Sequence, residues 1–248
     1  MISEILLAVI QAATEYLPVS SSGHLALVSN LISSPNLFFF TILHLASLFA
    51  VMIFLRKELV YLITFKKETR KMWIYWIIAT IPAAAVGFFF NDFVEQAFSS
   101  YLFLGLAFIF TGTVLYLTRF FTKNKKELDT KKSLKIGLLQ ALALFPGISR
   151  SGMTISAGLF QGVDKEKAAR FSFLLFIPLS IAAFILEFLK LETFQLTSSI
   201  VVSAIVCFIL SLLFLNVLMK IIKNDKFWMF SFYCWLIGII SLVLFFVL

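Results

Sequence analysis

Two clusters of polar residues interrupt this otherwise hydrophobic chain. The first is "EYLPVSSSGH", residues 15–24, and the second is "PGISRSGMT", residues 146–154. Lipid solvates neither a carboxylate nor a guanidinium, and an ionisable group at membrane depth is costly unless it is paired or hydrated. Glu15 and Arg150 therefore indicate a functional site. A purely structural ion pair is the alternative, but it would not require the hydroxyls and the histidine around it.

The types of these residues indicate a phosphate ligand. Arg150 offers a planar fork of donors that suits phosphate oxygens. Each cluster also opens a short helix, expected to begin near residues 23 and 152, and the N-terminal end of a helix favours an anion. The remaining candidate ligands are hydroxyls and backbone amides, namely those of Ser20, Ser22, Gly147, Ser149, Ser151, Gly152 and Thr154.

One amide and one carboxylate are candidates for metal binding. Gln11 and Glu15 stand four residues apart, on one face of the first half-helix. Their oxygens can hold a hard divalent cation, and Mg²⁺ typically binds one or two carboxylates together with substrate phosphates. We therefore expect a Mg²⁺ or Ca²⁺ site at Gln11 and Glu15.

The first cluster also contains a candidate nucleophile and a candidate base. Ser21 or Ser22 could attack phosphorus, and His24 could act as general base or acid near neutral pH. We favour Ser21 as the nucleophile with His24 as its base. Attack by metal-activated water, with Ser21 only positioning the phosphate, stays open. For the other histidine, His44, a satisfied interior residue is favoured, although its span could border the cavity.

The composition is typical of a membrane protein with several spans. Of 248 residues, 61% are hydrophobic and only 14% are charged, whereas a soluble domain has about 25% charged residues. The net charge of +8 comes from basic residues in short loops, which indicates membrane orientation and not nucleic-acid binding. Both cysteines lie in apolar runs, so neither a disulfide nor a zinc site is expected. We also expect no removable signal peptide.

The pattern of apolar runs predicts an all-α integral membrane protein. Residues 2–34 and 133–163 each hold two runs too short to span, separated by a Gly/Ser/Pro cluster. Non-helical backbone at membrane depth is tolerated only where it is buried in protein or lines a wet cavity, so we expect two re-entrant helical hairpins. Six other stretches are long enough to be transmembrane helices, at about 36–55, 73–90, 98–118, 168–189, 197–219 and 227–248.

The basic residues predict the orientation. Nineteen of the 21 lysines and arginines fall in segments that this layout places on one side, and the positive-inside rule makes that side cytoplasmic. The loops 91–97 and 190–196, together with both termini, should then face outside. The four basic segments are 56–71, 119–135, 165–170 and 220–226.

The two halves of the chain are related at a constant offset of 129 residues. "IQAATEYLPVSSSG" (10–23) then aligns with "LQALALFPGISRSG" (139–152). Each half holds one hairpin and three spans, and an odd number of spans inverts the second half. We expect one membrane domain of two inverted repeats, 1–121 and 130–248, whose hairpin tips meet near mid-membrane at the functional site. Chance similarity between Ser/Gly-rich loops is the alternative.

Both clusters resemble motifs of the undecaprenyl-diphosphate phosphatases. "QAATEYLPVSSSGH" is similar to the family's Glu/Gln-x-x-x-Glu motif with its Leu-Pro-(Val/Ile)-Ser-Ser-(Thr/Ser)-Gly-His run. "PGISRSGMT" is similar to its Pro-Gly-x-Ser-Arg-Ser-Gly-x-Thr motif, and "ARFSFLLFIPLSIAA" is also similar to the family. The resemblance covers the whole chain. Position 11 is glutamine, which the motif allows, and this leaves Glu15 as the main carboxylate.

The resemblance implies a plasma-membrane enzyme that converts undecaprenyl, or another polyprenyl, diphosphate to the monophosphate. Such an enzyme recycles the lipid carrier of cell-wall sugars and gives bacitracin resistance. The resemblance also implies a divalent cation and an active site open to the outer face. A homodimer is left open. By motif position, the implied functional residues are Gln11, Glu15, Ser21, His24 and Arg150.

Two other functions deserve comparison. Phosphatases of the phosphatidic-acid-phosphatase type also use a Ser-Gly-His run, but they need a histidine six residues after an arginine, where this chain has Ser156. That interpretation fails. A transporter or flippase of polyprenyl phosphate stays open, because inverted repeats with half-helices at the midplane are transporter architecture.

Overall fold

The chain forms an all-helical bundle in the computed structural model, which describes residues 2–31, 37–64, 66–121, 126–189 and 197–247. Two short 3-10 turns, Thr118–Phe120 and Phe227–Met229, follow α7 and precede α12. The α-helices are α1 Ile2–Tyr16, α2 Ser21–Leu31, α3 Leu37–Phe54, α4 Arg56–Ile63, α5 Lys67–Phe89, α6 Asn91–Ala97, α7 Tyr101–Leu117, α8 Thr130–Leu142, α9 Arg150–Phe160, α10 Lys165–Leu189, α11 Ser198–Lys223 and α12 Phe230–Val247.

Helix length and hydropathy confirm a membrane protein with several spans. Among the described residues, five helices are long and apolar enough to cross a bilayer, in α5, α7, α10, α11 and α12. A sixth span results if α3 and α4 are counted together, although the chain bends by 73° between them. The predicted span 36–55 therefore corresponds to a straight helix, α3, followed by a sharp turn at Leu55. The predicted outer loop 190–196 lies outside the described residues.

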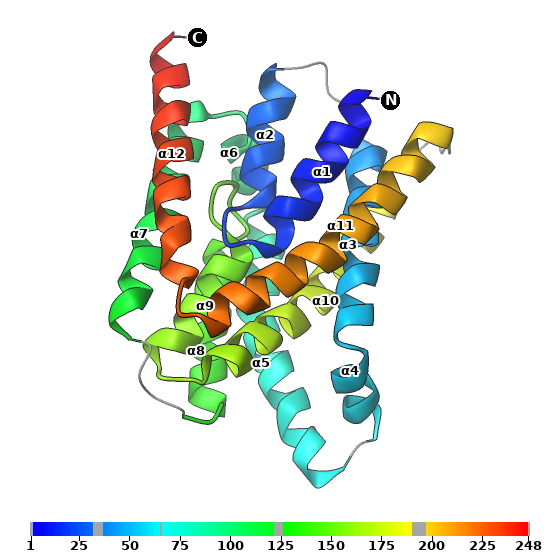
Figure 1. Cartoon of the computed structure of the whole chain (residues 1–248), viewed down its shortest axis with the longest axis vertical. Helices are drawn as coiled ribbons and strands as arrows, with labels where there is room; N and C mark the ends of the chain where they lie inside the picture. The colour runs from blue at the N-terminus through cyan, green and yellow to red at the C-terminus, as the bar shows by residue number, and fades with distance from the viewer. Residues whose placement is uncertain (1, 32–36, 65, 122–125, 190–196, 248) are drawn as a thin grey trace.

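Two helix pairs, α1–α2 and α8–α9, are each interrupted by a turn at a Gly/Ser/Pro cluster, as the sequence predicted. In the first turn Ser20 adopts a left-handed backbone conformation (φ 65°), and in the second Gly147 does so (φ 90°). The side chain of Ser149 caps α9 by accepting from the Gly152 amide. Both turns lie near mid-height of the molecule (Figure 1).

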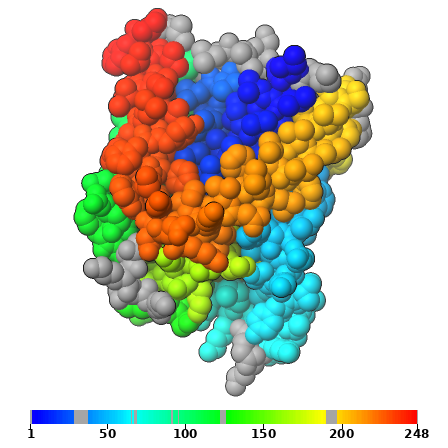
Figure 2. Space-filling model, in the orientation of Figure 1, coloured from blue at the N-terminus to red at the C-terminus, as the bar shows by residue number. Residues whose placement is uncertain are grey.

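The ends of the molecule differ in character. Figure 1 shows both termini and α6 at one end, whereas the α4–α5 connection and the start of α8 lie at the opposite end. In the space-filling view α11 crosses the lower part of α1, and α12 runs along the side of the same face (Figure 2). On this face, the first helix pair is therefore flanked by two helices from the second half of the chain, α11 and α12.

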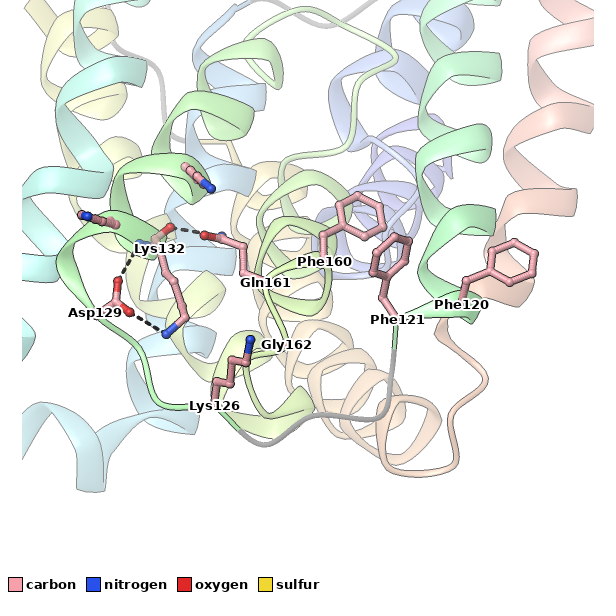
Figure 3. Close-up of a pocket in the computed structure, with 10 residues that line it drawn as sticks. Phe120, Phe121, Lys126, Asp129, Lys132, Phe160, Gln161 and Gly162 are labelled. Carbon is pink, nitrogen blue, oxygen red and sulfur yellow. Dashed lines mark hydrogen bonds and ion pairs between the residues drawn. The ribbon is translucent and has the colours of Figure 1, made fainter.

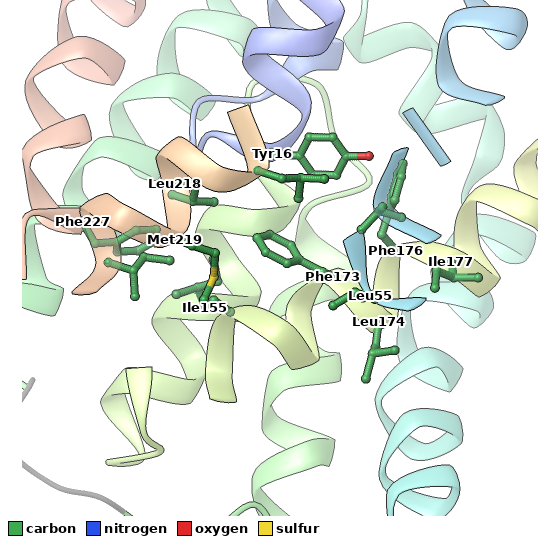
Figure 4. Packing of buried hydrophobic residues seen from close by; sticks show 14 of the residues in the cluster. Tyr16, Leu55, Ile155, Phe173, Leu174, Phe176, Ile177, Leu218, Met219 and Phe227 are labelled. Carbon is green, nitrogen blue, oxygen red and sulfur yellow. The ribbon is translucent and has the colours of Figure 1, made fainter. Parts of the chain in front are cut away.

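The largest apolar cluster lies directly beneath the first turn (Figure 4). Tyr16 is fully buried there, and its ring meets Phe173 and Phe176 of α10 edge to face, with centroids 6.0 and 5.8 Å away. The Tyr16 hydroxyl donates to the carbonyl of Ser47 on α3. Because a buried phenol needs such a partner, this contact fixes the end of α1 against α3 and α10.

Candidate active site

Glu15, at the end of α1, is the centre of a buried hydrogen-bond network. The Ser21 hydroxyl donates to its Oε2 at 2.6 Å, and the Gln11 amide donates to the same oxygen at 3.1 Å. Arg150 Nη2 donates to its Oε1 at 3.0 Å. The carboxylate thus joins Ser21, just after the first turn, to Arg150, just after the second. Glu15 and Arg150 are 135 residues apart in the sequence.

The guanidinium of Arg150 is held from three sides. Besides its ion pair with Glu15, it donates through Nη1 to the carbonyl of Ser172 at 3.2 Å, and it lies over the ring of Phe176 at 4.2 Å from the centroid. Only 13% of its side chain is exposed. Packing and hydrogen bonds therefore fix the plane of the guanidinium, which leaves its remaining N–H groups in a defined direction.

A direct contact joins the tips of the two helix pairs. The Ser20 hydroxyl accepts from the backbone amides of Gly147 at 3.1 Å and Gly23 at 3.3 Å. A Cβ at Gly23 would lie 2.7 Å from the Gly147 nitrogen, so only glycine allows this approach. Thr111 of α7 holds the second turn from the other side, since it donates to the Gly147 carbonyl and accepts from the Ser149 amide.

A cavity of about 640 Å³ opens beside this network. Its polar end contains Glu15, Ser20, Ser21, Ser22, His44, Ser149 and Arg150. Its other walls are mostly apolar and include Phe40, Phe98, Leu144, Leu179 and Phe184. The cavity therefore combines a charged, hydroxyl-rich end with an apolar groove, and this combination suits an amphiphile with an anionic headgroup.

The comparisons with known proteins agree with this geometry. Residues 4–240 match the family described as bacitracin resistance protein BacA. The chain belongs to the BacA family. A protein of Thermosipho africanus named undecaprenyl-diphosphatase is 42% identical, with 96% of this chain and 98% of the relative covered. One of Methanosphaera stadtmanae with the same name is 36% identical, with 98% of each covered. Undecaprenyl-diphosphatase 3 of Bacillus cereus is 38% identical over 96% of this chain and 95% of its own length.

Several residues that the sequence predicted as ligands in this BacA family member support the turns instead of lining the cavity. The hydroxyl of Thr154 lies 2.6 Å from that of Ser172, and the hydroxyl of Ser151 donates to the carbonyl of Leu17. The Gly152 amide donates to Ser149. With Gly147, these residues hold the second turn in place against α10 and the first turn.

His24 does not make the contact with Ser21 that the sequence suggested. Its Nδ1 lies 2.8 Å from the carbonyl of Ser20, so it donates there, and Nε2 then accepts from the Tyr233 hydroxyl at 2.8 Å. The ring also stacks on Tyr233 of α12. Both nitrogens are therefore engaged on the side of α2 that faces α12, and the group beside the Ser21 hydroxyl is Glu15.

The structure decides how the second histidine, His44, is placed. The sequence favoured a satisfied interior residue on a span that could border the cavity, and the structure shows the second feature, because 41% of its side chain is exposed and it lines the cavity. Its Nδ1 lies 3.0 Å from the carbonyl of Phe40 on the preceding helical turn, which directs Nε2 to a point 3.7 Å from Glu15 Oε2. A signal was available in the sequence: Thr41, His44 and Ser47 form a polar stripe on an otherwise apolar helix.

The oxygen ligands around Glu15 suit the expected divalent cation only in part. Within the described part of the chain, no three His, Cys, Asp or Glu side chains lie close enough to form a metal site. However, the amide oxygen Oε1 of Gln11 is buried without a hydrogen-bond partner, next to the Glu15 carboxylate. One carboxylate and one unsatisfied amide oxygen fit a hard cation that takes its other ligands from phosphate and water.

Proposed function

We propose that this chain hydrolyses undecaprenyl diphosphate, or a similar polyprenyl diphosphate, to the monophosphate and inorganic phosphate. The observation that carries the proposal is the cavity in which Ser21, Glu15 and Arg150 meet at the polar end of an apolar groove. The names of the relatives agree with this substrate. The diphosphate would lie against the two turns, and the first isoprene units would lie in the groove.

In the mechanism that we favour, the Ser21 hydroxyl attacks the terminal phosphorus. Its proton passes to Glu15, the Oγ–P bond forms, and the bond from phosphorus to the bridging oxygen breaks. The leaving group is the lipid monophosphate. Arg150 stabilises the charge on the phosphate oxygens. Water then hydrolyses the phosphoserine. Direct attack by water, with Ser21 only positioning the phosphate, remains the alternative.

A divalent cation would be held by Glu15 and Gln11 together with phosphate oxygens. When bound, it would neutralise charge on the diphosphate. Glu15 would then interact with both the cation and the Ser21 hydroxyl, and Arg150 would keep its own contact with the phosphate.

The architecture that we propose is a pair of inverted repeats with two re-entrant hairpins, α1–α2 and α8–α9. The helix contacts support it: α1 packs on α11 while α8 packs on α5, and α3 packs on α11 while α10 packs on α5. At the offset of 129 residues, α1 corresponds to α8, α3 to α10 and α5 to α11, so each contact in one half has its counterpart in the other. The central pair α7–α12 maps onto itself.

The same geometry supports an active site open to the outer face of the plasma membrane. The cavity is lined by Phe98 and Ser99, just before α7, and by Glu187, near the end of α10. Figure 1 shows α6, which precedes α7, at the end of the molecule opposite the basic starts of α5 and α8. By the positive-inside rule the basic end is cytoplasmic, so the mouth faces outward.

A direct experiment separates hydrolysis from transport. Purified protein in detergent should release phosphate from undecaprenyl diphosphate. A chelator should lower this rate at least about tenfold, and added Mg²⁺ or Ca²⁺ should restore it. A protein that binds the lipid diphosphate but releases no phosphate under any of these conditions would be a transporter and not a phosphatase.

Cysteine labelling tests the orientation. In a variant without Cys207 and Cys234, a cysteine at Val94 of α6 should react with a membrane-impermeant reagent added outside intact cells. A cysteine at Lys126, on the basic side, should react only after the membrane is opened. The reverse result would overturn the proposed sidedness.

His44 is expected to contact the substrate phosphate through Nε2. We predict that His44→Ala lowers kcat/KM about tenfold, which corresponds to about 1.4 kcal/mol of transition-state stabilisation. Ser99→Ala, which also alters the cavity wall but lies away from Glu15, should leave kcat/KM unchanged. Equal effects of the two substitutions would mean that His44 acts only through the shape of the cavity.

A further inference from the structure

A second cavity, of about 480 Å³, is lined in part by the start of α8, at the end of the molecule opposite the two termini (Figure 1), and Figure 3 shows its lining residues. Lysine side chains dominate its polar wall: Lys126, Lys131, Lys132 and Lys135, with Asp129 as the single carboxylate. These residues come from the start of α8 and from the segment just before it. None of them takes part in the chemistry proposed above.

Among the described residues that line this cavity, the one acidic side chain is already neutralised. Asp129 Oδ2 pairs with the Lys132 ammonium at 2.5 Å, and Lys132 also donates to the carbonyl of Glu127. The Glu127 carboxylate in turn pairs with Lys167 at 2.6 Å. The lysine–carboxylate pairs around the cavity therefore leave no negative charge for the other lysines.

Three lysines of the cavity remain uncompensated. Lys126, Lys131 and Lys135 are exposed, and no carboxylate of the described residues lies within ion-pair distance of their ammonium groups. Lys131 and Lys135 stand one helical turn apart on α8, where two like charges repel each other. An anionic ligand would relieve this repulsion.

The other side of the cavity is aromatic. Phe121 and Phe160 pack with ring centroids 5.0 Å apart, and Phe120 and Phe121 leave 65% and 47% of their surfaces exposed. Phe120 ends the candidate span Tyr101–Phe120, so these rings lie at the level where a bilayer meets water. Figure 3 shows the phenylalanines on one side of the cavity and Lys126, Lys132 and Asp129 on the other.

We propose that this cavity binds an anionic phospholipid of the cytoplasmic leaflet. Its phosphate would lie among Lys126, Lys131 and Lys135, and its acyl chains would lie over Phe120 and Phe121. Basic pockets between membrane helices on the cytoplasmic side are suited to anionic headgroups. A free phosphate ion would use the lysines but not the exposed aromatic rings, and this favours a lipid as the occupant.

Such a lipid would contact three segments of the fold at once. The Lys126 amide donates to the carbonyl of Gly162 at 2.8 Å, which joins this segment to the end of α9. Lys131 and Lys135 belong to α8, and the two phenylalanines follow α7. Binding should therefore stabilise the α8–α9 pair against the rest of the bundle.

The test uses the full-length protein in phosphatidylcholine nanodiscs with and without phosphatidylglycerol. The triple variant Lys126→Gln/Lys131→Gln/Lys135→Gln is compared with a matched control, Lys57→Gln/Lys71→Gln/Lys220→Gln, which removes the same charge from exposed lysines elsewhere. We expect phosphatidylglycerol to raise the Tm of the native protein and of the control. In the triple variant its affinity should fall at least about tenfold.

Three outcomes would overturn the proposal. An equal loss in the control would mean that only the general charge of this face matters. An unchanged affinity in the triple variant would remove the site. Protection by inorganic phosphate that matched phosphatidylglycerol and needed the same lysines would make the ligand a soluble anion. Phosphate release from the lipid substrate reports whether each variant is folded. If the triple variant does not fold, the single variant Lys135→Gln replaces it, and we expect a partial loss of its affinity for phosphatidylglycerol.

Discussion

Replacing Ser21 with alanine lowers the rate of phosphate release by about a thousandfold or more, if its hydroxyl is the nucleophile. The structure gives a reason for this large effect. The hydroxyl lies 2.6 Å from Glu15 Oε2, so the group that must lose a proton already donates to a carboxylate. Alanine removes the attacking oxygen, and Glu15 loses the hydroxyl that donates to its Oε2. Water attacking in its place could still give its proton to Glu15, but no covalent bond would hold it in the position of the Ser21 oxygen.

Rapid-quench measurements with labelled diphosphate check this result directly, because label should be trapped on Ser21 during turnover. Ser22→Ala is the matched control, since Ser22 also lines the cavity but its hydroxyl lies near that of Ser20 and not near Glu15. If Ser21→Ala kept more than about a tenth of the rate, a change of only about 1.4 kcal/mol, direct attack by water would be the better mechanism.

Replacing Glu15 with glutamine should lower the rate about a hundredfold or more, which is the usual range for the loss of a general base. Glutamine has nearly the same shape, so the cavity keeps its outline. The substitution removes the proton acceptor for Ser21 and one ligand of the proposed cation. It also leaves the buried guanidinium of Arg150 without its counter-charge, which threatens stability as well as catalysis.

The two consequences can be separated with a double variant. Glu15→Gln/Arg150→Gln removes the unpaired charge, so it should recover stability relative to Glu15→Gln without recovering activity. Thermal unfolding and phosphate release of both variants are the measurements. A double variant that regained the native rate would contradict both the role of Glu15 as a base and the role of Arg150 in binding the phosphate.

The centre of the site could be predicted from the sequence because charges at membrane depth are rare. Glu15 and Arg150 stand out in the sequence for that reason, and the structure places their charged groups 3.0 Å apart. The alignment at offset 129 likewise predicted that the two turns would meet, and Ser20 indeed bonds Gly147. The charged pair and the contact between the two turns can be predicted because they follow from composition and residue spacing.

Side-chain direction could not be predicted in the same way. Ser21 and His24 are three residues apart on α2 and would normally share a face. Ser21 is the first residue of the helix, however, and its hydroxyl turns back to Glu15 on α1, whereas His24 turns to Tyr233 on α12. The exposure of His44 could not be decided because α3 is apolar nearly all round, and hydrophobicity alone does not tell which face of such a helix meets a cavity.

The pairing of Glu15 with Arg150 also constrains how the protein is made. The carboxylate leaves the ribosome 135 residues before the arginine that neutralises it. During that interval the first helix pair holds an uncompensated charge, which the hydrocarbon core disfavours. Until the second half has been inserted, the nascent α1–α2 pair must keep Glu15 either hydrated or protonated. We therefore expect its entry into the bundle to be a late event in biogenesis, although it precedes the second half in the chain.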